Sequence, residues 1–164
     1  MATEAIEAAD YRRIIGQFAT GVTVLTTAND GLLHGMTASA ITSVSLDPLL
    51  LLVCIDKAAH SHEQFTQSDR FTVNILAEDQ QEVSQIFATT SKPEQGRLQG
   101  VAFHLGANGA PVIEGCLAYI ECTVADRCEG GDHTIFIGGV EDATVVREAA
   151  PLLFYQSKYR RLAD

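Results

Sequence analysis

The sequence predicts a single, mainly β domain, an antiparallel barrel with a few helices packed outside it. Its 164 residues fit one domain, residues 1–164, with no interdomain linker or repeat. Apolar and β-branched runs separated by short turns outnumber the helical segments. The G-x-G-x-x-G pattern of a dinucleotide-binding parallel sheet is absent, which argues against a Rossmann fold.

Three helices are predicted, at residues 3–19, 58–68 and 80–88. The first lies within an N-terminal segment, 1–20, in which apolar residues recur at helical spacing; Thr3 is its expected cap and Gly21 its end. Asp79 is the expected cap of the third helix. The apolar stripe of the first helix is formed by Ile6, Ala9, Ile14, Ile15 and Phe18.

The strands are predicted from β-branched runs and from the turns between them. Residues 22–28 and 33–45 are expected to pair across the turn Asn29-Asp30-Gly31. Leu49–Ile55 is apolar throughout, which is typical of a fully buried strand. A long polar loop is expected at 89–100. The remaining strands are predicted at 71–76, 101–105, 116–128, 133–146 and 152–155, with the turn Glu129-Gly130-Gly131-Asp132 joining the two longest.

The charge of the chain disfavours anionic partners. Eleven Lys and Arg face 21 Asp and Glu, for a net charge of −10, and such a surface repels nucleic acid and anionic lipid. The longest apolar run, Leu49–Ile55, is far shorter than the roughly 20 residues of a membrane-spanning helix. The N-terminus has no signal-peptide pattern, so a cytoplasmic location is expected.

The four cysteines are interpreted as buried free thiols rather than as metal ligands. They lie at positions 54, 116, 122 and 128, without a zinc-type spacing. No metal site is therefore predicted. The last three are spaced by six residues, so on one regular strand they would share a face.

Three segments contain residues suited to chemistry. Gly35–Pro48 is rich in small and hydroxyl residues, which let a ligand approach the backbone. His133 follows a glycine turn that can present it to a cleft. Pro151–Leu162 brings together two tyrosines and three cations. Each segment also has a purely structural interpretation, as a solvent-facing strand, a polar strand end or an amphipathic tail. Neither a G-x-S-x-G elbow nor a P-loop is present.

In this order, these segments resemble the short-chain flavin reductase family, the reductase components of two-component flavin monooxygenases. The similarity runs from about Tyr11 to Leu162 and is greatest to phenol and 4-hydroxyphenylacetate hydroxylase reductases. The motifs that carry it are Phe18-Ala-Thr-Gly-Val-Thr-Val24, Gly35-Met-Thr-Ala-Ser39, Ser43-Val-Ser-Leu-Asp-Pro48, Val73-Asn-Ile-Leu76, Gly131-Asp-His-Thr-Ile-Phe-Ile-Gly138 and Pro151-Leu-Leu-Phe-Tyr155.

The resemblance implies a split β-barrel that works as a homodimer and binds FMN or FAD. It implies hydride transfer from NADH or NADPH to the flavin, and diffusion of the reduced flavin to a partner monooxygenase. Two alternatives stay open. One is a flavoprotein that keeps its flavin bound and reduces ferric iron or a quinone. The other is a non-catalytic flavin- or haem-binding module.

The resemblance also implies the site residues. His133 corresponds to a position near the nicotinamide, which it would orient without transferring a proton. Lys57 and Ser61 are the best local candidates for an anion, and the segment 150–164 would border the site. The flavin-contacting positions are Thr37, Ala38, Ser39, Cys54, Ile55, Asp56, Lys57, Ser61, Phe87, Ala88, Lys92, Tyr155, Tyr159 and Arg160. Six cations would then gather at one cleft, namely Lys57, Lys92, Arg97, Lys158, Arg160 and Arg161.

Overall fold

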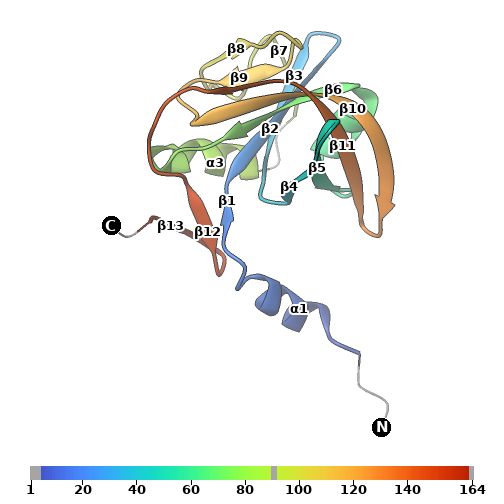
Figure 1. Cartoon of the computed structure of the whole chain (residues 1–164), viewed down its shortest axis with the longest axis vertical. Helices are drawn as coiled ribbons and strands as arrows, with labels where there is room; N and C mark the ends of the chain where they lie inside the picture. The colour runs from blue at the N-terminus through green and yellow to red at the C-terminus, as the bar shows by residue number, and fades with distance from the viewer. Residues whose placement is uncertain (1–4, 90–91, 163–164) are drawn as a thin grey trace.

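A computed structural model describes residues 5–89 and 92–162 of the chain, which fold around one large antiparallel sheet (Figure 1). Its eight strands lie in the order β4-β5-β11-β10-β6-β2-β3-β7. The sheet has β4 and β7 at its two ends and does not close into a hydrogen-bonded ring, so it forms a split barrel. The strands are β2 (Thr23–Asn29), β3 (Leu32–Ala38), β4 (Ile41–Leu46), β5 (Leu49–Asp56), β6 (Arg70–Ile75), β7 (Glu94–Gln95), β10 (Ala118–Gly130) and β11 (His133–Val145).

Two smaller sheets complete the β-structure, and the mainly β prediction is confirmed. One sheet joins an early strand to the C-terminal hairpin in the order β1-β12-β13, and the other pairs β8 with β9. β1, β9 and β13 were not among the predicted strands, because two or three residues are too few to show the alternation of apolar and polar side chains that marks a strand. Their bounds are β1 (Thr20–Gly21), β8 (Phe103–Leu105), β9 (Pro111–Ile113), β12 (Leu153–Tyr155) and β13 (Lys158–Arg160).

The helices are shorter than the sequence predicts. They are α1 (Ala8–Ile15), α2 (Ser61–Gln67) and α3 (Gln81–Ala88), with a 3₁₀ turn, η1 (Glu78–Gln80), before α3. The predicted first helix ends early because Thr20 and Gly21 pair with β12 as strand β1; its expected cap, Thr3, lies outside the described residues. Among the helices that the structure describes, none is long and apolar enough to cross a membrane.

The predicted cap of the third helix is wrong. Gln80, not Asp79, occupies the N-cap position of α3. The Asp79 carboxylate instead accepts hydrogen bonds of 2.6 and 3.1 Å from the Arg147 guanidinium. These bonds lower the pKa of Asp79. They also fasten the segment that follows β11 to the turn before α3.

The predicted strand 33–45 is in fact two strands that belong to different parts of the sheet. β3 pairs with β2, whereas β4 pairs with β5. The chain crosses between them at Ser39-Ala40, where the Ala40 carbonyl accepts a hydrogen bond from the Cys54 amide. The small residues at this crossing therefore lie where the sheet splits.

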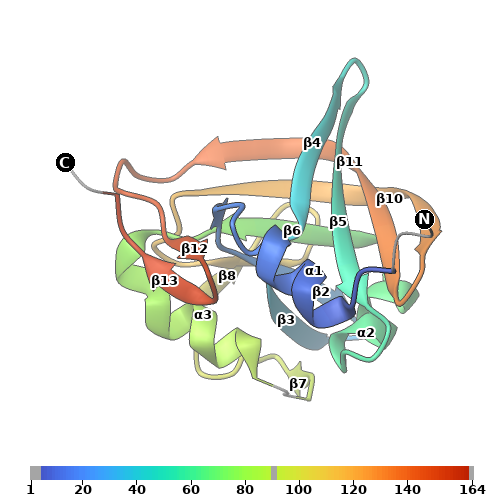
Figure 2. The same cartoon turned by 90° about the horizontal axis from the view of Figure 1, so that it is seen from below.

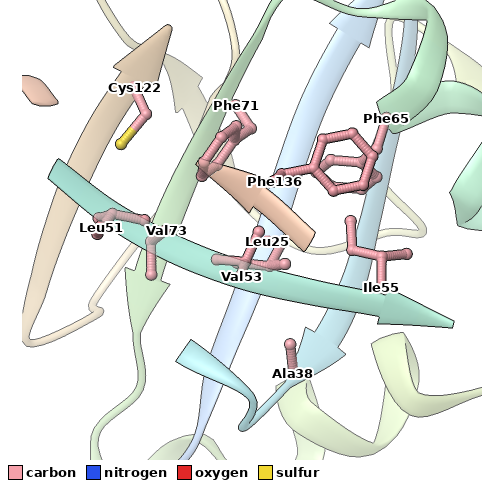
Figure 3. Packing of buried hydrophobic residues seen from close by; sticks show 10 residues of the cluster. All are labelled: Leu25, Ala38, Leu51, Val53, Ile55, Phe65, Phe71, Val73, Cys122 and Phe136. Atoms are coloured by element: carbon pink, nitrogen blue, oxygen red, sulfur yellow. The ribbon is translucent and has the colours of Figure 1, made fainter. Parts of the chain in front are cut away.

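The core lies on both sides of β2, which explains why residues 23–27 of this strand are buried on both faces. Val24 and Leu25 are both fully buried, but they belong to different clusters. The cluster inside the curved sheet, seen in Figure 3, comprises Leu25, Ala38, Leu51, Val53, Ile55, Phe65, Phe71, Val73, Cys122 and Phe136. The cluster beneath α3 and the C-terminal segment comprises Val22, Val24, Leu33, Leu76, Phe87, Leu98, Ile113 and Leu152.

The expectation that the last three cysteines share one buried face is wrong. Cys116 precedes β10; Cys122 is buried, whereas Cys128 is exposed. The β10–β11 ladder shifts register between Glu121 and Cys122 and again between Val124 and Asp126. Such irregularities change which side chains face inward. All four thiols are free, as expected, but Cys54 is only half-buried.

Candidate active site

A cleft of about 560 Å³ opens where the sheet splits, and we call it the Ser39 cleft. Its walls come from α1, the crossing between β3 and β4, β5, and the turn after β12. Three predicted flavin-contacting residues, Ser39, Cys54 and Tyr155, line it. Burial raises the pKa of the Cys54 thiol, which keeps it neutral and apolar in character. The other lining residues are Arg12, Ile15, Gly16, Phe18, Thr20, Ala40, Ile41, Thr42, Leu52, Phe154, Gln156 and Ser157.

A second cavity, of about 130 Å³, lies along β3 between the start of α2 and the end of α3; we call it the His34 pocket. Four predicted residues line it: Thr37, Ser61, Phe87 and Ala88. The two cavities lie next to each other along the chain, because Thr37 lines one and Ser39 lines the other. The remaining lining residues are His34, Gly35, Met36, Ala59, His60 and Thr89.

The C-terminal segment is fixed to the site strand through α3. The Thr37 hydroxyl donates to the Ser84 carbonyl over 2.6 Å. The Ser84 hydroxyl lies 2.8 Å from the Tyr159 hydroxyl, and the Tyr159 ring packs edge-on against Phe154 with centroids 5.5 Å apart. Tyr159 therefore supports the site strand through α3, whereas Tyr155 lines the cleft itself.

His133 begins β11 and lies opposite Asp56, the last residue of β5. Its Nδ1 is 2.7 Å from a carboxylate oxygen of Asp132. Because a carboxylate only accepts, Nδ1 is the donor of this hydrogen bond. This hydrogen bond lowers the pKa of Asp132, and the Arg12 guanidinium adds a smaller effect in the same direction.

The loop after β5 is bound to the turn that carries His133. The Lys57 ammonium contacts the Glu129 carboxylate at 2.5 Å and the Gly131 carbonyl at 2.8 Å. His62 Nε2 lies 2.8 Å from the Thr134 hydroxyl. Lys57, a predicted anion contact, is thus already engaged by a carboxylate and a carbonyl.

The other predicted residues lie apart from these cavities. The side chains of Ala38 and Ile55 point into the core. The Ala38 carbonyl accepts a hydrogen bond of 2.7 Å from the Thr23 hydroxyl, and Ile55 is paired with Thr134 of β11. Lys92 is exposed. Arg160 lines a separate cavity together with Arg161 and Glu78.

The expectation that six cations gather at one cleft is wrong. In the described part of the chain, none of the six lines the Ser39 cleft or the His34 pocket. The cation that does line the cleft is Arg12, which sequence reasoning missed, as it missed His34. The sequence does not mark Arg12 as a site residue, because basic residues are common on the polar face of an amphipathic helix.

Two features of β3 shape the His34 pocket. A Cβ at Gly35 would lie 2.6 Å from Cε1 of Phe87, so the glycine lets this aromatic ring pack directly against the strand. The buried His34 Nδ1 has no hydrogen-bond partner, which leaves it for a polar group of a ligand.

The comparison with protein-family models decides the family. The flavin reductase like domain matches residues 15–163, nearly the whole chain. The chain belongs to this family. Flavin reductase PheA2 in its native state superposes with a TM-score of 0.88 at 44% identity, over 97% of this chain and 100% of that one.

Named relatives of this flavin reductase agree in sequence and in structure. The reductase subunit HsaB of a flavin-dependent monooxygenase from Mycobacterium tuberculosis is 39% identical over 94% of this chain and 82% of its own length. An NADH-dependent FAD reductase from Streptomyces globisporus is 41% identical over 93% and 84%. The structure of SgcE6 from that organism, in complex with NAD and FAD fragments, superposes with a TM-score of 0.86 at 40% identity, covering 98% of each chain.

Proposed function

We propose that the chain is an NAD(P)H:flavin oxidoreductase that supplies reduced flavin to a partner monooxygenase. The observation that carries the proposal is the pair of cavities that Thr37 and Ser39 line, within a chain of this family. The predicted enzyme class and cofactors are confirmed by relatives named as NADH-dependent FAD reductase and solved with NAD and FAD fragments. Relatives are also named as reductase components of monooxygenases.

The two cavities suggest a division of roles. The His34 pocket, with Thr37 and Ser61, receives the polar end of the flavin. The Ser39 cleft, largely apolar, holds flat rings. His133 lines neither cavity but pairs with Asp56 at the end of β5, and from there it orients the nicotinamide. The bound flavin supplies the hydride-accepting chemistry, while the protein supplies placement and electrostatics. A dependence on NADH also favours a cytoplasmic location.

The function is tested by crossing NADH and NADPH with riboflavin, FMN and FAD in steady-state assays. We expect rapid NADH oxidation that requires added flavin. Reduced flavin should also restore a flavin-dependent monooxygenase placed across a dialysis membrane, because the flavin diffuses. Turnover with ferric iron or a quinone but no transfer across the membrane would contradict release of the flavin and favour a tightly bound one.

We further propose a homodimer, because two apolar surfaces stand uncovered on one chain. The described helix α1 buries none of its residues, and Phe18 just after it is 72% exposed. The hairpin of β4 and β5 projects beyond the rest of the sheet, with Leu46 82% exposed at its tip (Figure 2). A second copy of the chain would cover both surfaces and close the outer wall of the Ser39 cleft.

The dimer predicts a mass of about twice 17.6 kDa in solution. Leu46→Asp places a charge in the proposed interface and should shift the protein toward the monomer. Leu105→Asp, at an exposed leucine of β8, is the matched control and should leave the dimer intact. Light scattering after gel filtration measures both, and a monomeric parent protein would contradict the proposal.

A further inference from the structure

The His34 pocket contains two buried polar side chains that lack ordinary partners. His34 is 3% exposed and its Nδ1 has no hydrogen bond. Ser61 is 4% exposed and its hydroxyl reaches only the thioether sulfur of Met36, at 3.1 Å. Buried polar groups in native proteins nearly always have a partner, so this pocket is built for a ligand that brings hydrogen-bonding oxygens.

The same pocket is lined by groups that become cationic only by taking up a proton. Of its lining residues, all within the described chain, none is a lysine or arginine, whereas His34 and His60 both line it. Lys57, close by in sequence, is held by Glu129 and Gly131 on the β10–β11 turn. An anion that enters this pocket therefore meets positive charge only if a histidine becomes protonated.

We propose that the pocket receives the phosphate end of the flavin, and that binding is accompanied by proton uptake at His34. This inference rests on the proposed flavin reductase function and adds a property to the same site. Flavin affinity then depends on pH, and the dependence comes from the phosphate end rather than from the ring.

The sign of the dependence follows from the surroundings of His34. In the free protein, burial and the neighbouring His60 lower the pKa of His34, so its imidazole is neutral near pH 7. An adjacent phosphate stabilises the imidazolium and raises that pKa. Affinity should therefore increase as the pH falls through the pKa of the complex, and level off below the pKa of the free protein.

The other titratable groups on the elements that pack around His34 are His62 and Glu63 on α2, Glu82 on α3, Glu94 on β7, and Cys54 and Asp56 on β5. Among all of these and His60, it is His60 that acts on the pKa of His34. His62 Nε2 is hydrogen-bonded to the Thr134 hydroxyl on β11, and His62 does not line the His34 pocket.

The test is the dissociation constant of FAD between pH 5.5 and 8.5, with riboflavin as the probe that lacks phosphate. FAD is chosen because its pyrophosphate keeps the same charge over this range, unlike the phosphate of FMN. We expect FAD to bind about tenfold more tightly for each pKa unit by which binding shifts the histidine. Riboflavin affinity should stay flat. A flat FAD profile, or an equal slope for riboflavin, would overturn the proposal.

A variant tests whether His34 is the group that takes up the proton. His34→Gln should reduce the slope of the FAD profile. His104→Gln, at an exposed histidine that pairs with Glu114, should keep it. An unchanged slope in His34→Gln would assign the pH dependence elsewhere and refute the role of His34.

A measurement on the unmodified protein tests the proposal without relying on a variant that could fail to fold. Calorimetry of FAD binding at pH 7, in two buffers of different ionisation enthalpy, counts the protons taken up. We expect net uptake with FAD and none with riboflavin; zero uptake with FAD would overturn the proposal. If FAD binds and is reduced by NADH without proton uptake, only this inference fails. If no flavin binds, the proposed function fails with it.

Discussion

His133→Ala should lower kcat/KM for NADH by about 10- to 100-fold and leave the dissociation constant of FAD nearly unchanged. His133 lies at the start of β11, where its Nδ1 forms a hydrogen bond of 2.7 Å with Asp132. Loss of the ring removes a positioning contact for the nicotinamide, whereas the residues that line the two proposed flavin cavities do not include His133. Steady-state kinetics and a flavin titration separate the two effects.

Asp132→Asn tests whether the orientation of His133 matters. The amide removes the charged acceptor that selects the Nδ1–H tautomer of His133. We therefore expect kcat/KM for NADH to fall, but by less than in His133→Ala. His104→Ala is the matched control, because it removes an exposed imidazole paired with Glu114 and should have no effect. Unchanged NADH kinetics in His133→Ala would remove His133 from the site.

Gly35→Ala should weaken flavin affinity by more than about tenfold and destabilise the fold by about 1–3 kcal/mol. The added methyl would lie 2.6 and 2.8 Å from Cε1 and Cδ1 of Phe87. The Phe87 ring is 3% exposed and packed in the cluster beneath α3, so it has little room to move. The end of α3, which lines the His34 pocket, must shift instead.

Gly139→Ala provides the control for an added methyl group on a strand. Its Cβ would meet nothing nearer than the Thr123 carbonyl oxygen at 3.7 Å, an ordinary contact. We expect flavin affinity close to that of the parent protein. Thermal unfolding and flavin titration measure both variants, and equal behaviour of the two would show that the close approach at Gly35 has no role.

The long elements of the fold were predictable from the sequence because their patterns are strong. The apolar run Leu49–Ile55 became β5, but the expectation that it is fully buried is wrong: Leu51, Val53 and Ile55 are buried, whereas Leu49 is exposed and the residues between them are half-buried. The glycine turn before His133 joins β10 to β11 as expected. The break at Ser39-Ala40 was not predictable, because small and hydroxyl residues fit a continuous strand equally well. Only the separate partners of β3 and β4 end one strand and begin the next.

Site residues were predictable where they belong to a recognisable motif. They were missed where only their burial in the folded structure shows that they line a cavity. Ser39, Thr37 and Ser61 line the cavities as the motifs suggest. His34 was missed because a lone histidine in a strand carries no signal until its unpaired Nδ1 is seen. The cations were misjudged because proximity in sequence does not show that Glu129 already holds Lys57.

The central claim is that this chain moves reducing equivalents from a nicotinamide to a flavin. Anaerobic mixing of the protein with FAD and one equivalent of NADH tests it most directly, with the flavin absorbance near 450 nm followed in time. We predict rapid loss of that absorbance, matched mole for mole by NADH oxidation and much slower in His133→Ala. Persistence of the oxidised flavin spectrum, with FAD bound and NADH unconsumed, would contradict it.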